Sequence, residues 1–128
     1  MKAFFLSLFS LTIFFFLSCN KEELGTLPTV ITIAPIDITE TTIQIGGIII
    51  CKGALNITEM GACWDSEGHP GLSDSKIATV PSLTAGDTIK FNGLITGLTT
   101  KTTYYVRAYA INAAGTAFGE CLKVCTCK

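Results

Sequence analysis

Cysteine is the residue type through which this chain could do the most chemistry. The 128 residues contain six of them: Cys19, Cys51, Cys63, Cys121, Cys125 and Cys127. Cys19 stands apart, because it directly follows an apolar N-terminal stretch and the small residue Ser18. The other five are an odd number, so in a compartment where disulfides persist at least one must stay free or pair between chains.

The spacing of the last three cysteines does not favour a metal site. Structural zinc sites use paired, closely spaced ligand sets, and the single histidine, His69, lies in a Gly-Pro turn far away in the sequence. Residues two apart in a flat strand are separated by about 6.5–7 Å, whereas disulfide Cβ atoms lie about 3.8 Å apart. We therefore expect no metal ion, no cofactor and no bond between Cys125 and Cys127.

No combination of polar residues predicts catalysis. His69 has no serine or cysteine nearby in a nucleophile turn, which leaves it as an exposed loop residue. The carboxylate pairs Asp65 with Glu67 and Asp74 with Asp87 fall in or beside polar loops, without the aromatic cleft that glycosidases use. We expect these carboxylates to be solvated and the protein not to be an enzyme.

The N-terminus has the pattern of a secretion signal. Lys2 supplies the positive charge, and the 14 residues from Phe4 to Leu17 are mostly apolar. Crossing a membrane takes roughly 20 such residues, so this stretch predicts a signal peptide over residues 1–18. Without these residues, which contain one lysine and no acidic residue, the formal net charge changes from −1 to −2. The chain therefore has no basic footprint for nucleic acid.

Phe16-Leu17-Ser18-Cys19 resembles the lipobox of bacterial lipoproteins. The resemblance implies that Cys19 becomes the acylated first residue and anchors the protein in a membrane; the alternatives are an ordinary cleaved signal peptide and a short buried helix. The following Lys21, Glu22 and Glu23 resemble the signal that carries Bacteroidetes lipoproteins to the outer face of the outer membrane, with a plain charged tether facing the periplasm as the alternative. Residues 19–27 are then the acylated cysteine and tether, and residues 28–128 the folded domain.

From Leu27 onward the chain alternates short β-type segments with Gly, Asn, Asp and Pro, and shows no amphipathic helical stretch. The predicted strands are Thr29–Ile33, Thr42–Cys51, Thr58–Asp65, Lys76–Val80, Asp87–Leu94, Thr102–Asn112 and Thr116–Thr126. Seven short strands in about 100 residues favour an all-β, two-sheet sandwich.

The segment from Gly97 to Asn112, followed by Gly115, resembles the E–F corner and F strand of the fibronectin type III and immunoglobulin-like fold. The resemblance implies that Leu98 closes the end of the core and that the Tyr104 hydroxyl returns to the upstream backbone as a tyrosine corner. With period two, Tyr104 and every second residue after it then face the core.

Ile57-Thr58-Glu59-Met60-Gly61-Ala62-Cys63-Trp64 resembles a strand of the fibronectin type III-like domains in Bacteroidetes surface lipoproteins, and residues 104–120 resemble their closing strands. The resemblance implies that Trp64 packs in the core or on a sheet face and that Cys63 is a small buried hydrophobe. In that topology the end of the second strand and the start of the last share one pole, which makes Cys51–Cys121 the disulfide to expect.

Tyr105, Arg107 and Tyr109 alternate with the core-facing residues, so they could form a flat aromatic and guanidinium surface for a sugar or protein ligand. The alternative is cross-strand packing that shields the sheet face. Asp87-Thr88-Ile89 also resembles a Bacteroidetes O-glycosylation motif, or simply starts a strand.

Together these features predict an outer-membrane lipoprotein whose single domain is a non-enzymatic binding module for an unidentified protein or glycan. The alternative is a structural spacer or assembly protein facing the periplasm, with no external ligand. Because unrelated functions share this fold, the ligand itself is not predicted.

Overall fold

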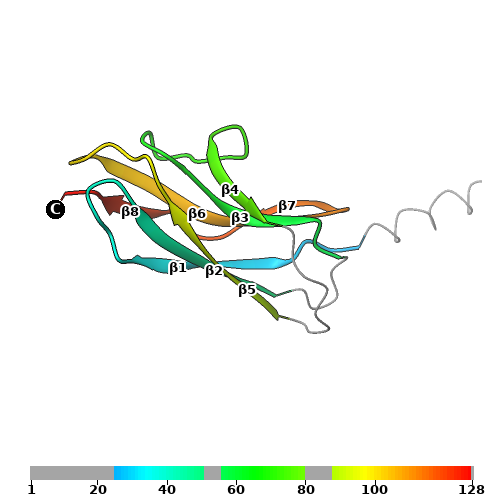
Figure 1. Ribbon diagram of the computed structural model, residues 1–128. Helices are drawn as coiled ribbons and strands as arrows, with labels where there is room; N and C mark the ends of the chain where they lie inside the picture. Colours follow the sequence, from blue (N-terminus) through cyan, green and yellow to red (C-terminus); the bar gives the residue numbers. More distant parts are fainter. Residues whose placement is uncertain (1–24, 51–55, 80–87, 128) are drawn as a thin grey trace, which may run out of the picture.

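The computed structural model describes residues 25–50, 56–79 and 88–127, which form eight strands in two layers (Figure 1). The strands are β1 (Thr29–Ile36), β2 (Ile43–Ile50), β3 (Glu59–Asp65), β4 (Ser75–Thr79), β5 (Thr88–Ile95), β6 (Thr103–Asn112), β7 (Gly115–Phe118) and β8 (Leu122–Cys125). The described residues include no helix with the length and apolarity needed to cross a membrane. The acyl and export motifs, Cys19 with Lys21, Glu22 and Glu23, lie outside the described residues, as does Cys51.

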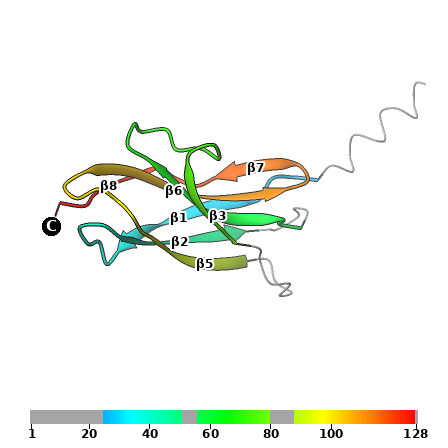
Figure 2. The ribbon, with the colours of Figure 1, turned by 45° about the horizontal axis from the view of Figure 1, so that its top comes forward.

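One sheet has the strand order β1-β2-β5, and the other has β4-β3-β6-β7 with β8 also paired to β6. Every pairing is antiparallel, and Figure 2 shows the two sheets stacked face to face. Hairpin and cross-sheet connections of this kind define a β-sandwich with the fibronectin type III-like arrangement of strands. The predicted fold class is therefore confirmed.

The core lies between the sheets and follows the period-two alternation of the strands. Ile43, Ile45 and Ile49 of β2 are buried against Val106, Ala108 and Ala110 of β6. Small alanines on β6 let the isoleucines of the opposite sheet approach closely, so the two layers interdigitate. Trp64 is half-buried and packs against the edge of this core, as the sequence predicted.

The predicted corner before β6 is present. Leu98 is buried, and the Tyr104 hydroxyl accepts a hydrogen bond of 2.9 Å from the backbone N–H of Thr99. Gly97 has a φ of 72°, a left-handed conformation that costs glycine little. The tyrosine corner therefore fixes the phase of β6 and decides which of its side chains face the core.

The last predicted strand, Thr116–Thr126, is interrupted, because β7 ends at Phe118 and β8 begins at Leu122. At the break the Ala108 carbonyl still accepts from Gly119 N–H at 2.8 Å, but Ala108 N–H donates instead to Thr32 Oγ1 at 3.0 Å. A side chain from β1 thus replaces a strand partner, which explains why polar Thr32 is buried. The interruption was not predicted from the sequence.

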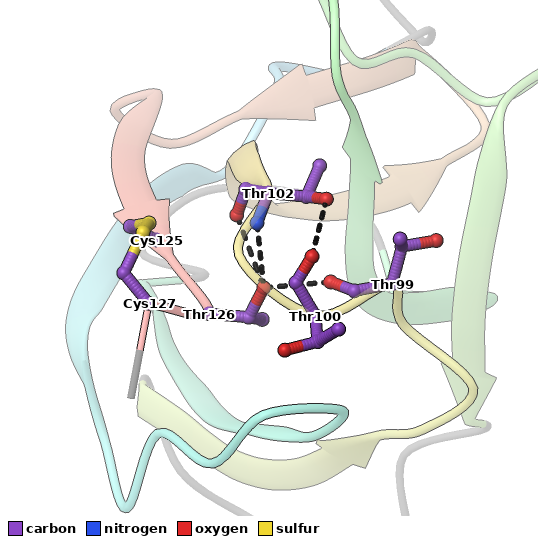
Figure 3. The surroundings of a disulfide bond; sticks show 6 residues. All are labelled: Thr99, Thr100, Thr102, Cys125, Thr126 and Cys127. Atoms are coloured by element: carbon purple, nitrogen blue, oxygen red, sulfur yellow. Dashed lines mark hydrogen bonds between the residues drawn. A yellow bond between two sulfur atoms is a disulfide. The ribbon is translucent and has the colours of Figure 1, made fainter.

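A disulfide joins Cys125 and Cys127, and the prediction that they would not bond is wrong (Figure 3). The prediction assumed a flat strand through both residues. β8 ends at Cys125, however, and the two Cα atoms lie 5.1 Å apart, within the usual range for disulfides. Between them, Thr126 Oγ1 accepts from Thr102 N–H at 3.0 Å and lies 2.7 Å from the Thr99 carbonyl oxygen. The chain turns inward there and is held against the corner.

Cys121 is a free, exposed thiol, which contradicts the expected Cys51–Cys121 disulfide. The expectation placed Cys121 at the start of the last strand, where it would meet the end of β2. That strand starts at Gly115, and six further residues advance an extended chain by about 20 Å. Cys121 instead lies beside the β3–β4 connection, with its Sγ 3.9 Å from the Gly68 carbonyl oxygen.

Candidate ligand-binding site

The predicted ligand surface lies on the outer face of the β4-β3-β6-β7 sheet, where Tyr105, Arg107 and Tyr109 alternate along β6. The alternation is as predicted, but the face is not open to a ligand. Tyr109 is completely buried, with an exposed fraction of 0%, and Tyr105 and Arg107 are only half-exposed. The alternative interpretation, cross-strand packing, describes Tyr109, which faces away from the core but is not accessible to a ligand.

Tyr109 is covered because neighbouring strands bring a polar pair and an aromatic ring over it. Gly61 is its partner on β3, and Phe118 is its partner on β7. The Tyr109 hydroxyl donates to Glu59 Oε2 at 2.7 Å, and Lys76 Nζ lies 3.2 Å from the same oxygen. Burial, followed by the hydrogen bond to Glu59, raises the pKa of Tyr109, so its hydroxyl remains a proton donor.

Arg107 is held by three contacts on the same face. Its Nε donates to the Pro70 carbonyl oxygen at 2.7 Å, and its guanidinium carbon lies 3.8 Å from the centre of the Phe118 ring. Buried Cys63 lies across from it on β3. Burial raises the pKa of the Cys63 thiol, although the hydrogen bond from Arg107 acts in the opposite direction. Cys63 is therefore buried, as predicted, and its raised pKa keeps the thiol protonated.

The β3–β4 connection, residues 66–74, forms the cover. In Figure 1 this green segment folds back above β3 and β6, and its Pro70 is among the fully buried residues. Asp65 shapes the start of the turn, since its two carboxylate oxygens accept from Gly68 N–H at 3.0 Å and His69 N–H at 3.2 Å. His69 is exposed, as the sequence predicted.

A pocket of about 440 Å³ opens where this connection meets the β5–β6 corner. Its lining includes the Trp64 and Tyr104 side chains together with three carboxylates, from Asp65, Glu67 and Asp74. Two aromatic residues thus lie beside carboxylates for which the sequence indicated no aromatic cleft of the kind glycosidases use, and most of the pocket's lining is polar. Trp64 immediately precedes Asp65, and that adjacency was the available signal. Tyr104 comes near them because β6 pairs with β3 in the same sheet, where Asp65 is the partner of Tyr105.

Two further points of the sequence analysis concern a metal site and a glycosylation motif. Among the described residues no group of three or more His, Cys, Asp or Glu side chains is arranged to hold a metal ion. Thr88 begins β5 and is exposed, whereas Asp87 of the proposed glycosylation motif lies outside the described residues.

The chain matches no protein-family model and no curated protein. Its structure is similar to the sensor domain of the anti-sigma factor RsgI4 from Pseudobacteroides cellulosolvens, with a TM-score of 0.53 and 14% identity over 80% of this chain and 96% of that one. Its structure is more weakly similar to the FN1–FN3 domains of chicken CNTN1, with a TM-score of 0.48 and 13% identity. That match covers 83% of this chain and 32% of the other. At such identities the likeness concerns the fold alone.

Proposed function

We propose that this protein is an acylated outer-membrane lipoprotein that presents one fibronectin type III-like sandwich at the cell surface as a non-enzymatic binding module. The observation that carries the proposal is the position of Cys19, at the end of a short apolar segment and ten residues before β1 begins at Thr29. The apolar segment is too short to span a membrane, so a covalent lipid is the anchor that fits this arrangement.

The binding part of the proposal rests on the kind of domain that follows the anchor. β-Sandwiches of this class serve as interaction modules, and this one has an open pocket lined by aromatic rings and carboxylates at one pole. The outer face of β3 and β6 is filled by the protein's own side chains, which leaves the pole as the better candidate for a ligand.

The anchor is tested by Cys19→Ala in the full chain. We expect this variant to lose acylation and to leave the membrane fraction. Cys121→Ala, which removes an exposed free thiol elsewhere, is the matched control and should fractionate as the original protein does. A processed Cys19→Ala protein that stays in washed membranes would contradict the proposal.

Surface display is tested separately by replacing Lys21, Glu22 and Glu23 together with alanine. We expect acylation to persist and antibody labelling of intact cells to fall. Replacing Glu40, Glu120 and Lys123, which are exposed residues of the domain, makes the same change in charge and should not affect labelling. Equal labelling of both triple variants would mean that Lys21, Glu22 and Glu23 are not the export signal, and absence of labelling of the original protein would favour the periplasmic spacer.

A further inference from the structure

The pocket at the pole brings together two kinds of side chain that can bind a cation. Its lining includes the aromatic residues Trp64 and Tyr104, which also pack against the core. Three acidic residues, Asp65, Glu67 and Asp74, line the same pocket. Aromatic and acidic residues therefore share a mostly polar space that is large enough for a small organic group.

The two aromatic rings are held in place by the fold. Tyr104 is fixed by its hydroxyl, which accepts from Thr99 N–H at 2.9 Å, so its ring cannot swing away. Trp64 packs against the buried core while still lining the pocket. Such pre-positioned rings lose little conformational freedom when a ligand stacks on them.

The carboxylates also retain capacity for a ligand. Asp74 Oδ2 accepts from Gly71 N–H at 2.8 Å, which orients the side chain and leaves Oδ1 to accept from a ligand. Glu67 is exposed. No lysine, arginine or histidine lines this pocket among the described residues, so the three carboxylates make its mouth a region of negative potential.

We propose that this pocket binds an organic cation, the guanidinium group of an arginine side chain presented by a partner protein. A planar cation stacks favourably on aromatic faces, and its N–H donors pair with carboxylate oxygens in charge-assisted hydrogen bonds. An anion would be repelled by the carboxylates. The inference rests on the proposed role as a binding module and names the chemistry of its ligand.

The chain carries its own reporter of this binding, because Trp64 is its single tryptophan. We would titrate the full acylated chain in detergent micelles with Nα-acetyl-arginine amide and follow the tryptophan fluorescence. The matched control probe is Nα-acetyl-citrulline amide, which keeps the shape and loses the charge. We expect saturable binding of the arginine probe, at least about tenfold weaker binding of the citrulline probe, and weakening of the former as salt is raised.

Variants then assign the interaction to the carboxylates. Asp74→Asn and Glu67→Gln keep the side-chain size. Each should lower the affinity for the arginine probe about threefold to fivefold, which is the effect expected for a partly exposed charge pair. Glu120→Gln, an exposed carboxylate outside the pocket, should leave affinity unchanged.

Equal affinity for the two probes, equal loss in Glu120→Gln, or binding of a neutral disaccharide in preference to the arginine probe would each overturn the inference. These results would leave surface display untouched, because the labelling of intact cells is measured independently. Absence of surface labelling of the original protein on intact cells, with retained arginine binding, would instead contradict the proposed function alone.

Discussion

The two outer faces of the sandwich differ in what covers them. On the β4-β3-β6-β7 sheet, the outward residues Cys63 and Tyr109 are both 0% exposed, beneath the 66–74 connection and its neighbours. On the β1-β2-β5 sheet, the outward residues Ile31 and Leu94 are 43% and 51% exposed. Alternation therefore predicts the direction of a side chain, whereas loops and neighbouring strands decide its exposure.

The two faces also differ in composition. The covered face holds charged and aromatic residues, including Arg107, Glu59 and Lys76, while the bare face carries isoleucines such as Ile31 beside polar residues such as Lys90. Polar groups on the covered face are nevertheless partnered, and no buried side-chain nitrogen or oxygen among the described residues lacks a hydrogen bond. That face is a second, polar packing layer.

The largest expected difference is the reactivity of the two thiols that are free among the described residues. Cys63 lies under the cover and Cys121 is exposed, so a maleimide should label Cys63 on the order of a hundredfold or more slowly, because a packed segment must open first. Mass spectrometry of labelled peptides measures both rates in the same sample. Comparable rates in native protein, with no change on adding urea, would mean that the 66–74 connection does not cover the face.

The second largest expected difference is the loss of unfolding free energy when a side chain on each face is truncated. Tyr109→Ala removes a buried ring and should cost about 3–5 kcal/mol of unfolding free energy. Ile31→Ala on the bare face should cost about 1 kcal/mol or less, since much of that side chain is already in water. Urea midpoints of the two variants test the comparison, and similar losses would show that the bare face is also packed against something.

The parts predicted from sequence are those fixed by local pattern. Leu98, Tyr104 and the alternation along β6 follow from neighbouring residues, and the structure confirms them. The covered Tyr109 and the free Cys121 depended on distant segments: Gly61 and Phe118 meet Tyr109 only through strand pairing. The pocket escaped notice for the same reason, since Tyr104 comes near the loop carboxylates through the pairing of β3 with β6, in which Asp65 is the partner of Tyr105.

A smaller effect tests the phase of β6, on which the assignment of both faces depends. Tyr104→Phe should cost about 1 kcal/mol, because Thr99 N–H loses its partner at the corner. Tyr105→Phe should cost much less, since within the described part of the chain its hydroxyl has no hydrogen-bond partner. Urea midpoints in the opposite order would mean that Tyr105, and with it Arg107, faces the core.

The smallest effect is a pH dependence that belongs to the covered face alone, where Glu59 accepts from Tyr109 and Lys76. The hydrogen bond from Tyr109, followed by that from Lys76, holds the pKa of Glu59 below its ordinary value of 4.5. A carboxyl with a lowered folded-state pKa adds stability above its unfolded pKa and loses it as the pH falls through the folded value. The urea midpoint should therefore drop between about pH 5 and about pH 3, and Glu59→Gln should flatten that drop. Glu120→Gln, on an exposed residue between β7 and β8, is the matched control and should keep it. An unchanged profile in Glu59→Gln would show that the contacts of Glu59 with Tyr109 and Lys76 position side chains on the covered face without stabilising the fold.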